Sequence, residues 1–297
     1  MKGETLIMIK ITVFTPTFNR AYLLTNLYNS IKKQDYKDFE WIIVDDGSTD
    51  NTKELINKWI KENIIDIKYY YQENSGKHIA INSGIEHAIG ELFIIVDSDD
   101  ILSESALSII SKWHKTLINN KEKFAGIGGL KAYKKGGIIG TTFTGDFIDA
   151  TQLERNKYNI KGDKAEVFYT KVLKKYKFPK IENEKFISEA YIWNKIAADG
   201  YKIRWFNDVL IHCEYIADGL SKNRGKIEKN NPKGYLLYLK DLIKYEKNLF
   251  RKLAHYASYC NIANNIYSTN EIKKQLKISK LMVYLMLFLG KIRRCFF

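Results

Sequence analysis

Residues 92–100 read Leu-Phe-Ile-Ile-Val-Asp-Ser-Asp-Asp, so an apolar run leads directly into three carboxylates. An apolar run without polar alternation is typical of a strand buried on both faces of a parallel sheet. Ser103 is a suitable cap for a following helix, which places the carboxylates at the carboxyl end of the strand, where open α/β sheets bind ligands. Asp97 and Asp99 are two residues apart and would point the same way in extended chain. Such a pair favours Mg²⁺ or Mn²⁺, and the ion in turn favours a diphosphate.

The first hundred residues repeat one pattern, in which a short apolar run is followed by polar residues and then by helical spacing. Three further strands are predicted at 11–14, 41–44 and 67–71. This alternation predicts a parallel sheet with right-handed crossovers, and Pro16 is expected to end the first strand. A solvated acidic turn is the alternative for residues 97–100. Because several strands present polar residues at one edge of the sheet, a nucleotide site is the favoured interpretation.

The second half has a less regular pattern. Helices are expected at 103–117, 163–176 and 184–198, strands within 124–144 and at 202–206 and 209–213, and a loop at 218–234. Beyond this loop, leucines at helical spacing predict further helices that continue to about Leu289.

The composition indicates which kinds of partner and which cellular compartment suit this protein. The 297 residues carry a formal net charge of +14, which calls for a nucleic acid, an anionic membrane or a phosphorylated substrate. The cysteines, Cys213, Cys260 and Cys295, form no metal-binding pattern and fit a reducing cytosol. No apolar segment reaches the roughly 18 residues that a membrane span needs. We therefore expect a cytoplasmic protein.

Four motifs stand in order, each after a predicted strand or in a predicted helix: Thr15–Arg20, Val44–Asp50, Asn82–Gly84 and Val96–Asp100. With these motifs, the chain resembles a family 2 glycosyltransferase of the GT-A fold over about residues 8–215. The resemblance implies an α/β protein with a mostly parallel sheet flanked by helices and a helical C-terminal extension. It also implies inverting transfer of a sugar from a nucleotide sugar, usually a UDP-sugar, with Mg²⁺ or Mn²⁺.

The expected domains follow from the extent of the resemblance. Residues 1–220 would form the catalytic domain, with a nucleotide half at about 8–117 and an acceptor half at about 118–220. Residues 221–297 would form a basic helical extension.

The resemblance also assigns roles to individual residues. The base and ribose would be held by Thr15, Pro16, Thr17 and Asn19 together with Asp45 or Asp46. Asp97 would meet the ribose or the metal, Asp99 would bind the metal, and Lys77 would face uracil or phosphate. His212 stands at the end of a late predicted strand, where many GT-A enzymes place a third metal ligand. A half-buried histidine packed on Tyr215 is the alternative for this position.

An inverting transferase needs a base that takes the proton of the acceptor hydroxyl. Relatives usually carry a Glu-Asp pair where this chain has Ser188-Glu189-Ala190, so Glu189 is the expected base. An exposed helix glutamate is the alternative. The rival carboxylates are Asp163, Glu166, Glu182 and Glu184. Lys222 and Arg224 would clamp the diphosphate, unless they belong to a solvated charge run.

The tail combines an apolar run at 281–289 with basic flanks. This pattern predicts a helix that either lies at an anionic membrane surface or packs on the catalytic domain. The membrane interpretation favours peripheral attachment at the inner face of the cell membrane. It also favours a glycan or lipid-linked oligosaccharide acceptor in bacterial cell-surface polysaccharide synthesis.

Three other functions compete with this one. A sugar nucleotidyltransferase would need a glycine-rich loop after the first strand, and residues 15–20 contain no glycine. A nucleic-acid-binding protein is suggested by the charge, but no recognised nucleic-acid motif is present, so no nucleic-acid partner is expected. A non-catalytic sugar-binding module is disfavoured because Asp97 and Asp99 are both present.

Overall fold

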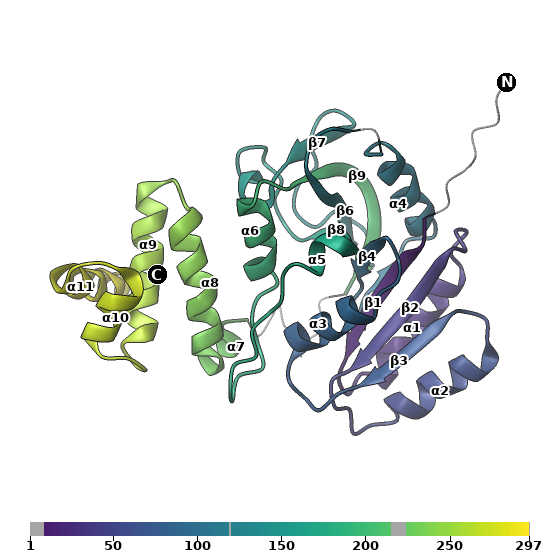
Figure 1. Cartoon of the computed structure of the whole chain (residues 1–297), viewed down its shortest axis with the longest axis horizontal. Helices are drawn as coiled ribbons and strands as arrows, with labels where there is room; N and C mark the ends of the chain where they lie inside the picture. The colour runs from purple at the N-terminus through teal and green to yellow at the C-terminus, as the bar shows by residue number, and fades with distance from the viewer. Residues whose placement is uncertain (1–8, 119, 215–223, 297) are drawn as a thin grey trace.

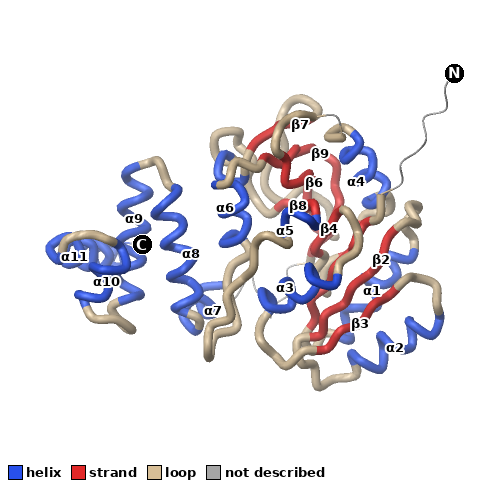
Figure 2. The backbone as a smooth tube through the Cα atoms, in the orientation of Figure 1, coloured by secondary structure: helices blue, strands red, loops and turns tan. Residues whose placement is uncertain are grey.

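The apolar run at 92–95 forms β4, the strand in the middle of a nine-stranded sheet. The structure is a computed structural model that describes residues 9–118, 120–214 and 224–296, with backbone alone for Arg224 and 291–296. The strand order is β3-β2-β1-β4-β8-β6-β9-β5, and β7 pairs with β9 (Figure 2). The bounds are β1 Ile11–Thr17, β2 Phe39–Asp45, β3 Ile67–Tyr71, β4 Leu92–Ile95, β5 Ile101–Leu102, β6 Phe124–Tyr133, β7 Phe147–Ala150, β8 Lys164–Tyr169 and β9 Lys202–Cys213.

The sheet is mixed. The four strands β3, β2, β1 and β4 run parallel, as expected, and β6 is parallel to β9. The strands β5, β7 and β8 pair with their neighbours in antiparallel fashion. The predicted α/β class with a helical C-terminal part is confirmed, while the parallel character belongs mainly to the first hundred residues.

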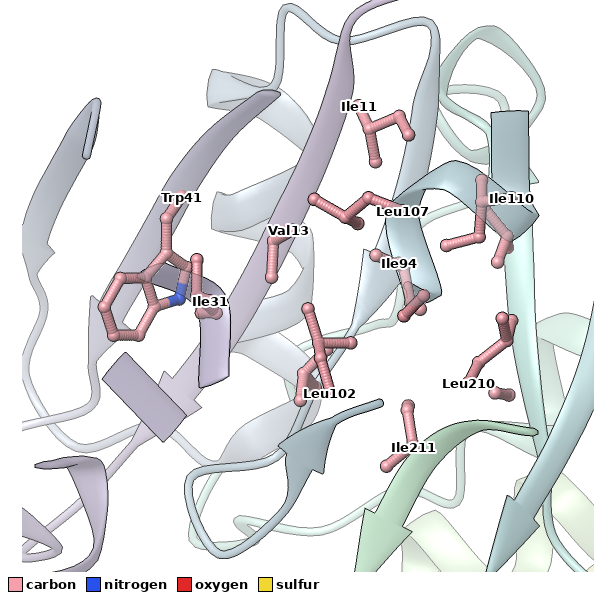
Figure 3. Packing of buried hydrophobic residues seen from close by; sticks show 14 of the residues in the cluster. Ile11, Val13, Ile31, Trp41, Ile94, Leu102, Leu107, Ile110, Leu210 and Ile211 are labelled. Atoms are coloured by element: carbon pink, nitrogen blue, oxygen red, sulfur yellow. The ribbon is translucent and has the colours of Figure 1, made fainter. Parts of the chain in front are cut away.

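Both faces of the parallel strands are buried, which explains their uninterrupted apolar sequences. One face packs on α1 (Ala21–Lys32), α2 (Thr52–Glu62) and α4 (Ala106–Lys115), and the other packs on α3 (Lys77–His87) and α6 (Ala190–Ala198). Figure 3 shows the first of these clusters, with Val13, Trp41 and Ile94 from three adjacent strands.

The prediction that Pro16 ends the first strand is wrong, because β1 continues to Thr17 and Pro16 pairs with Val44 of β2. The ladder between β1 and β4 stops at Phe14. No strand faces the side of Pro16 on which another residue would present its N–H. The missing donor therefore costs the sheet no hydrogen bond.

Residues 163–176 also differ from the prediction, since they form β8 and the short helix α5 (Thr170–Leu173). Their strand conformation depends on β4 and β6, which flank β8 and are distant in sequence. The two short strands expected at 202–213 are one strand, β9, whose pairing with β6 contains register shifts.

The C-terminal helices have a hydrophobic cluster of their own. They are α7 (Arg224–Asn230), α8 (Pro232–Tyr245), α9 (Leu249–Ala263), α10 (Thr269–Leu276) and α11 (Lys280–Phe296). The helices α7 and α8 occupy part of the segment for which a loop was expected. Figure 1 shows α9, α10 and α11 at the end of the molecule away from the sheet, with α8 beside α6. Among the described helices, none combines the length and apolar character that a membrane span requires.

Two details fix α8 against the sheet domain. The Glu184 carboxylate accepts hydrogen bonds from the backbone N–H groups of Lys233 and Gly234, at 2.9 and 2.7 Å. A Cβ atom on Gly234 would lie 2.4 Å from the carbonyl oxygen of Phe186, so glycine permits the close contact. The predicted domain boundary near residue 220 lies outside the described residues. The division into residues 1–220 and 221–297 remains a prediction, as do the two halves of the catalytic domain.

Candidate active site

The loops that follow β1 and β2 are tied together by Asn19. Its side-chain oxygen accepts a hydrogen bond from the N–H of Thr49, and its own N–H donates to the hydroxyl of Ser48, both at 2.8 Å. Asn19 has a φ of 51°, a conformation that asparagine tolerates better than most residues. The two polar strand ends therefore form one continuous edge, as the sequence predicted.

The predicted nucleotide-binding residues of β1 differ in what their side chains contact. The Thr15 hydroxyl accepts a hydrogen bond from Trp41 Nε1 at 2.9 Å and is buried. Pro16 is also buried. The Thr17 hydroxyl is buried and has no hydrogen-bond partner among the described residues. Of these three side chains, only that of Thr17 has a polar group without a hydrogen-bond partner among the described residues.

The carboxylates of Asp45 and Asp46 hold the loops around them. Asp45 accepts hydrogen bonds from the N–H of Ser48 and the hydroxyl of Tyr69, both at 2.8 Å. Asp46 accepts from Gln72 Nε2 at 2.7 Å and from the N–H groups of Ser75 and Gly76 at 2.8 Å. These bonds shape the loop that leads to Lys77. Their predicted contact with a base or ribose stays a prediction.

Lys77 joins two residues that the sequence placed in different roles. Its Nζ lies 2.7 Å from Asp97 Oδ1 and 2.7 Å from Glu189 Oε1. Burial lowers the pKa of Lys77, but the charges of Asp97 and Glu189 outweigh burial and hold its pKa above the ordinary value. The lysine is therefore protonated, and it links the end of β4 to the start of α6.

The three carboxylates after β4 have different environments. Burial raises the pKa of Asp97, but Lys77 and Lys131 outweigh it, so the pKa is lowered. The pKa of Asp99 is raised by burial and by the charge of Asp97. Burial raises the pKa of Asp100 to about 6, against the attraction of Lys131 at 3.4 Å. The repulsion between Asp97 and Asp99 is of the kind that a bound cation relieves.

The chemistry of Asp97 and Asp99 fits a divalent cation, because both are hard oxygen donors and Asp99 is destabilised as an anion beside its neighbour. His212 lies on β9, opposite Ile101 of β5. Within the described parts of the chain, no three His, Cys, Asp or Glu side chains converge as a metal site. The structure thus brings two of the three predicted ligands together, and His212 as a ligand remains a prediction.

A pocket of about 310 Å³ is lined by Lys77 and Asp97. Its wall also carries Lys131, Arg155, Lys164 and Glu166. Arg155 Nη1 lies 3.8 Å from the carboxylate of Glu166, and burial raises the pKa of Glu166 to about 7. Burial and the charge of Arg155 lower the pKa of Lys164 to about 8. The wall therefore offers several polar groups for the hydroxyl groups of a sugar.

The candidate bases differ in whether they line the pocket. Glu189 and Glu166 both line the pocket, whereas Glu184 caps α8 and Glu182 is exposed. Asp163 lines the pocket but is exposed. Lys222, predicted to clamp a diphosphate, lies outside the described residues, and for Arg224 the backbone alone is described.

Several pocket residues were missed from the sequence. Tyr238 of α8 lines the pocket, so the helical extension takes part in it. Lys131 and Lys164 lie in strands whose other residues are mostly buried. A lysine in a buried strand is unusual, so these two lysines could have been identified from the sequence as candidate site residues. Arg20 lowers the pKa of Asp97 through its charge; it is the last residue of the Thr15–Arg20 motif, but it was given no role from the sequence.

Residues 12–116 match the family model "Glycosyl transferase family 2". They cover the β1–β4 sheet, the Asn19 loop, Lys77 and all three carboxylates. This part of the chain is a family 2 glycosyltransferase domain. The resemblance found in the sequence is therefore confirmed, and the family 2 domain contains the whole predicted nucleotide edge.

Curated relatives match a larger part of the chain. A GalNAc(5)-diNAcBac-PP-undecaprenol beta-1,3-glucosyltransferase of Campylobacter jejuni is 31% identical over 193 residues, which are 63% of this chain and 59% of that protein. The poly(ribitol-phosphate) beta-N-acetylglucosaminyltransferase TarS of Staphylococcus aureus is 31% identical over 122 residues, 39% of this chain and 21% of that protein. The chain thus matches less than two thirds of the length of either relative.

Known structures extend the match to the helical part. S. aureus TarS 1–349 in complex with UDP-GlcNAc has a TM-score of 0.62 and 21% identity, covering 90% of this chain and 78% of that chain. The mannosyltransferase PcManGT from Pyrobaculum calidifontis, in complex with GDP-Man and Mn²⁺, has a TM-score of 0.56 and 18% identity, covering 94% and 86%. The chain and these two glycosyltransferase structures therefore share the GT-A fold.

Proposed function

We propose that this chain is an inverting glycosyltransferase that moves a sugar from a UDP-linked donor to a hydroxyl group of a glycan or lipid-linked acceptor. The observation that carries the proposal is the placement of Lys77 between Asp97 and Glu189 in the lining of a polar pocket. Transfer of a sugar from a diphosphate needs a positive charge near the leaving group and a carboxylate base near the acceptor, and this pocket carries both kinds of group. The family 2 match supports the same reaction class.

The donor side is formed by the edge of the family 2 domain. The nucleotide lies along the loops that Asn19 ties together, with Thr17 supplying an unpaired hydroxyl and the Asp45 and Asp46 loops enclosing the base and ribose. Asp97 and Asp99 would hold Mn²⁺ or Mg²⁺, which would supply Lewis-acid stabilisation of the departing diphosphate. Lys77 adds a positive charge to the same phosphate groups.

The acceptor side is formed by the start of α6 and the part of the pocket wall that carries Glu166. Inverting transfer is a single displacement, so the base must lie across the sugar from the diphosphate. Glu189 stands at the start of α6 and takes the proton of the acceptor hydroxyl. Glu166 is the second carboxylate of the pocket, and its pKa of about 7 suits a base near neutral pH. Glu189 is preferred because it lines the pocket at the position where relatives carry the Glu-Asp pair.

The names of the relatives guide the choice of acceptor. One acts on an undecaprenol-linked oligosaccharide and another on poly(ribitol-phosphate), and both come from bacteria. These names support a proposed role for this chain in bacterial surface polysaccharide synthesis, in the cytoplasm or at the inner face of the membrane.

The proposed function is tested by incubating the protein with a panel of nucleotide sugars and Mn²⁺ without acceptor. Slow hydrolysis of one UDP-sugar is expected, and calorimetry should show UDP binding in the micromolar range, roughly −7 to −8 kcal/mol. Asp99→Ala should reduce hydrolysis on the order of a thousandfold, and Asp97→Ala somewhat less. Full hydrolysis in excess EDTA would contradict the metal, and absence of UDP binding would contradict the donor.

The base is tested in the complete transfer reaction. Glu189→Gln keeps the size of the side chain but cannot take a proton, so turnover should fall about a hundred- to ten-thousandfold while UDP affinity is retained. Glu166→Gln is the matched variant from the same pocket. If Glu166→Gln abolishes turnover and Glu189→Gln does not, the role belongs to Glu166.

A further inference from the structure

The outer face of α11 is an exposed apolar stripe. Its members are spaced by three or four residues and lie on one side of the helix: Leu281, Tyr284, Leu285, Phe288 and Leu289. Leu281 is 79% exposed and Phe288 is 60% exposed. Single exposed apolar residues are ordinary, but five on one helical face form a continuous patch that water penalises.

The opposite face of α11 is already used. Val283 and Met286 are buried in the cluster of the helical extension, and a Cβ atom on Gly290 would lie 1.6 Å from the side chain of Asn261 in α9. The apolar run predicted from the sequence therefore packs on α9 and α10 with one side and leaves the other exposed. The helix is held in place, so its outer face is presented as a fixed surface.

The charges around this stripe are of one sign. Four exposed lysines precede it on α10 and at the start of α11: Lys273, Lys274, Lys277 and Lys280. From residue 271 to the last residue, the sequence contains one acidic side chain, Glu271, and seven basic ones. Glu271 accepts hydrogen bonds from the N–H and the hydroxyl of Ser268 in a helix cap.

We propose that the α11 stripe docks on the surface of an anionic lipid bilayer. An amphipathic helix with an exposed apolar face, preceded by exposed lysines, suits the interface of such a membrane. A second copy of this chain would bring the same lysines against one another, so charge complementarity favours the lipid. The helix lies on the membrane and does not cross it, which agrees with the length and polarity of the described helices.

The test is sedimentation of the full chain with vesicles of equal parts phosphatidylglycerol and phosphatidylcholine, with pure phosphatidylcholine vesicles in parallel. Binding is expected on the anionic vesicles at low salt and should be largely lost at about 1 M salt, where the Debye length is about 3 Å. Leu281→Ser with Phe288→Ser should lower the bound fraction on the order of tenfold. These side chains are exposed, so the double variant should keep its fold.

The matched control is Ile64→Ser with Ile89→Ser, which removes two apolar side chains of similar exposure, 57% and 62%, from the sheet domain. This control should bind the anionic vesicles as the unchanged chain does. Unchanged binding of the α11 double variant, or equal binding to neutral vesicles, would overturn the proposal. Light scattering that shows a dimer, converted to a monomer by the α11 variant, would also overturn it and identify the stripe as a subunit contact.

Discussion

Lys77 contacts both Asp97, a proposed metal ligand, and Glu189, the proposed base. Lys77→Met removes the one charge that lies within 3 Å of both Asp97 and Glu189 among the described residues. The two carboxylates then lose the ion pair that they share, and under the proposed function the diphosphate loses a cation, so turnover should fall on the order of a hundredfold or more. Steady-state transfer kinetics measure the effect.

The control is Lys177→Met, because Lys177 is 70% exposed and pairs with Glu86 at 3.8 Å on the surface. Its turnover should be unchanged. A Lys77→Met variant that keeps more than about a tenth of the turnover would remove Lys77 from the mechanism.

Glu166 links the pocket to the pH dependence of stability. Burial raises its pKa from 4.5 to about 7 in the folded protein, against the charges of Arg155 and Lys131 and with a smaller contribution from Glu189. Between these pH values the folded state holds a proton that the unfolded state has lost. The free energy of unfolding therefore falls as the pH rises from about 4.5 to 7.

Glu166→Gln cannot ionise, so it should remove this fall. Relative to the unchanged chain, the variant should be more stable at pH 8 than at pH 5 by up to about 3 kcal/mol. Urea unfolding at both pH values measures the difference. An equal effect at the two pH values would show that Glu166 keeps an ordinary pKa.

At the scale of elements, Gly76 holds the N-terminus of α3 against the segment that leads to Glu189. Gly76 has a φ of +94°, and a Cβ atom there would lie 2.0 Å from the carbonyl oxygen of Lys185. Gly76→Ala should push the two segments apart, separate Lys77 from Glu189, and cost about 1–3 kcal/mol of stability together with most of the turnover.

Gly136→Ala is a control with the same backbone demand. Gly136 has a φ of +97°, but nothing lies within 4 Å of the added Cβ atom. This variant should lose roughly 1 kcal/mol of stability and keep its turnover. Equal loss of turnover in both variants would show that the contact with Lys185 is unimportant.

At the scale of the molecule, α10 and α11 complete the core of the helical extension. They bury Ile272, Leu276, Val283 and Met286. Truncation after Asn270 removes all four, at roughly 1.5–3 kcal/mol each, so the extension should lose much of its helical structure on heating. UDP binding with Mn²⁺ should persist, because its groups lie in the family 2 domain.

Circular dichroism during heating and UDP calorimetry measure these two effects. Truncation after Gly290 keeps the four buried residues and should preserve the helical signal. Loss of UDP binding in the shorter chain would show that the sheet domain needs the extension in order to fold.

The sequence predicted the parts of this protein that local patterns specify. The run at 92–96 is apolar throughout because both faces of β4 are covered, and this pattern was readable. In contrast, β8 is a strand because β4 and β6 pair with it. No pattern within Lys164–Tyr169 indicates this pairing. Likewise, the sequence identified Lys77, Asp97 and Glu189 as candidate site residues. Their contacts with one another depend on the packing of α3 and α6 around the sheet.

The presence of Tyr238 in the pocket has a consequence for how such proteins diversify. The pocket is enclosed by two units with separate cores, and the second unit enters it through α8. Mutation or exchange of the extension can therefore reshape one wall of the pocket while leaving Asp97, Asp99 and the Asn19 loop intact. Under the proposed function, a changed extension should alter the choice of acceptor while the donor chemistry of the family 2 domain stays the same.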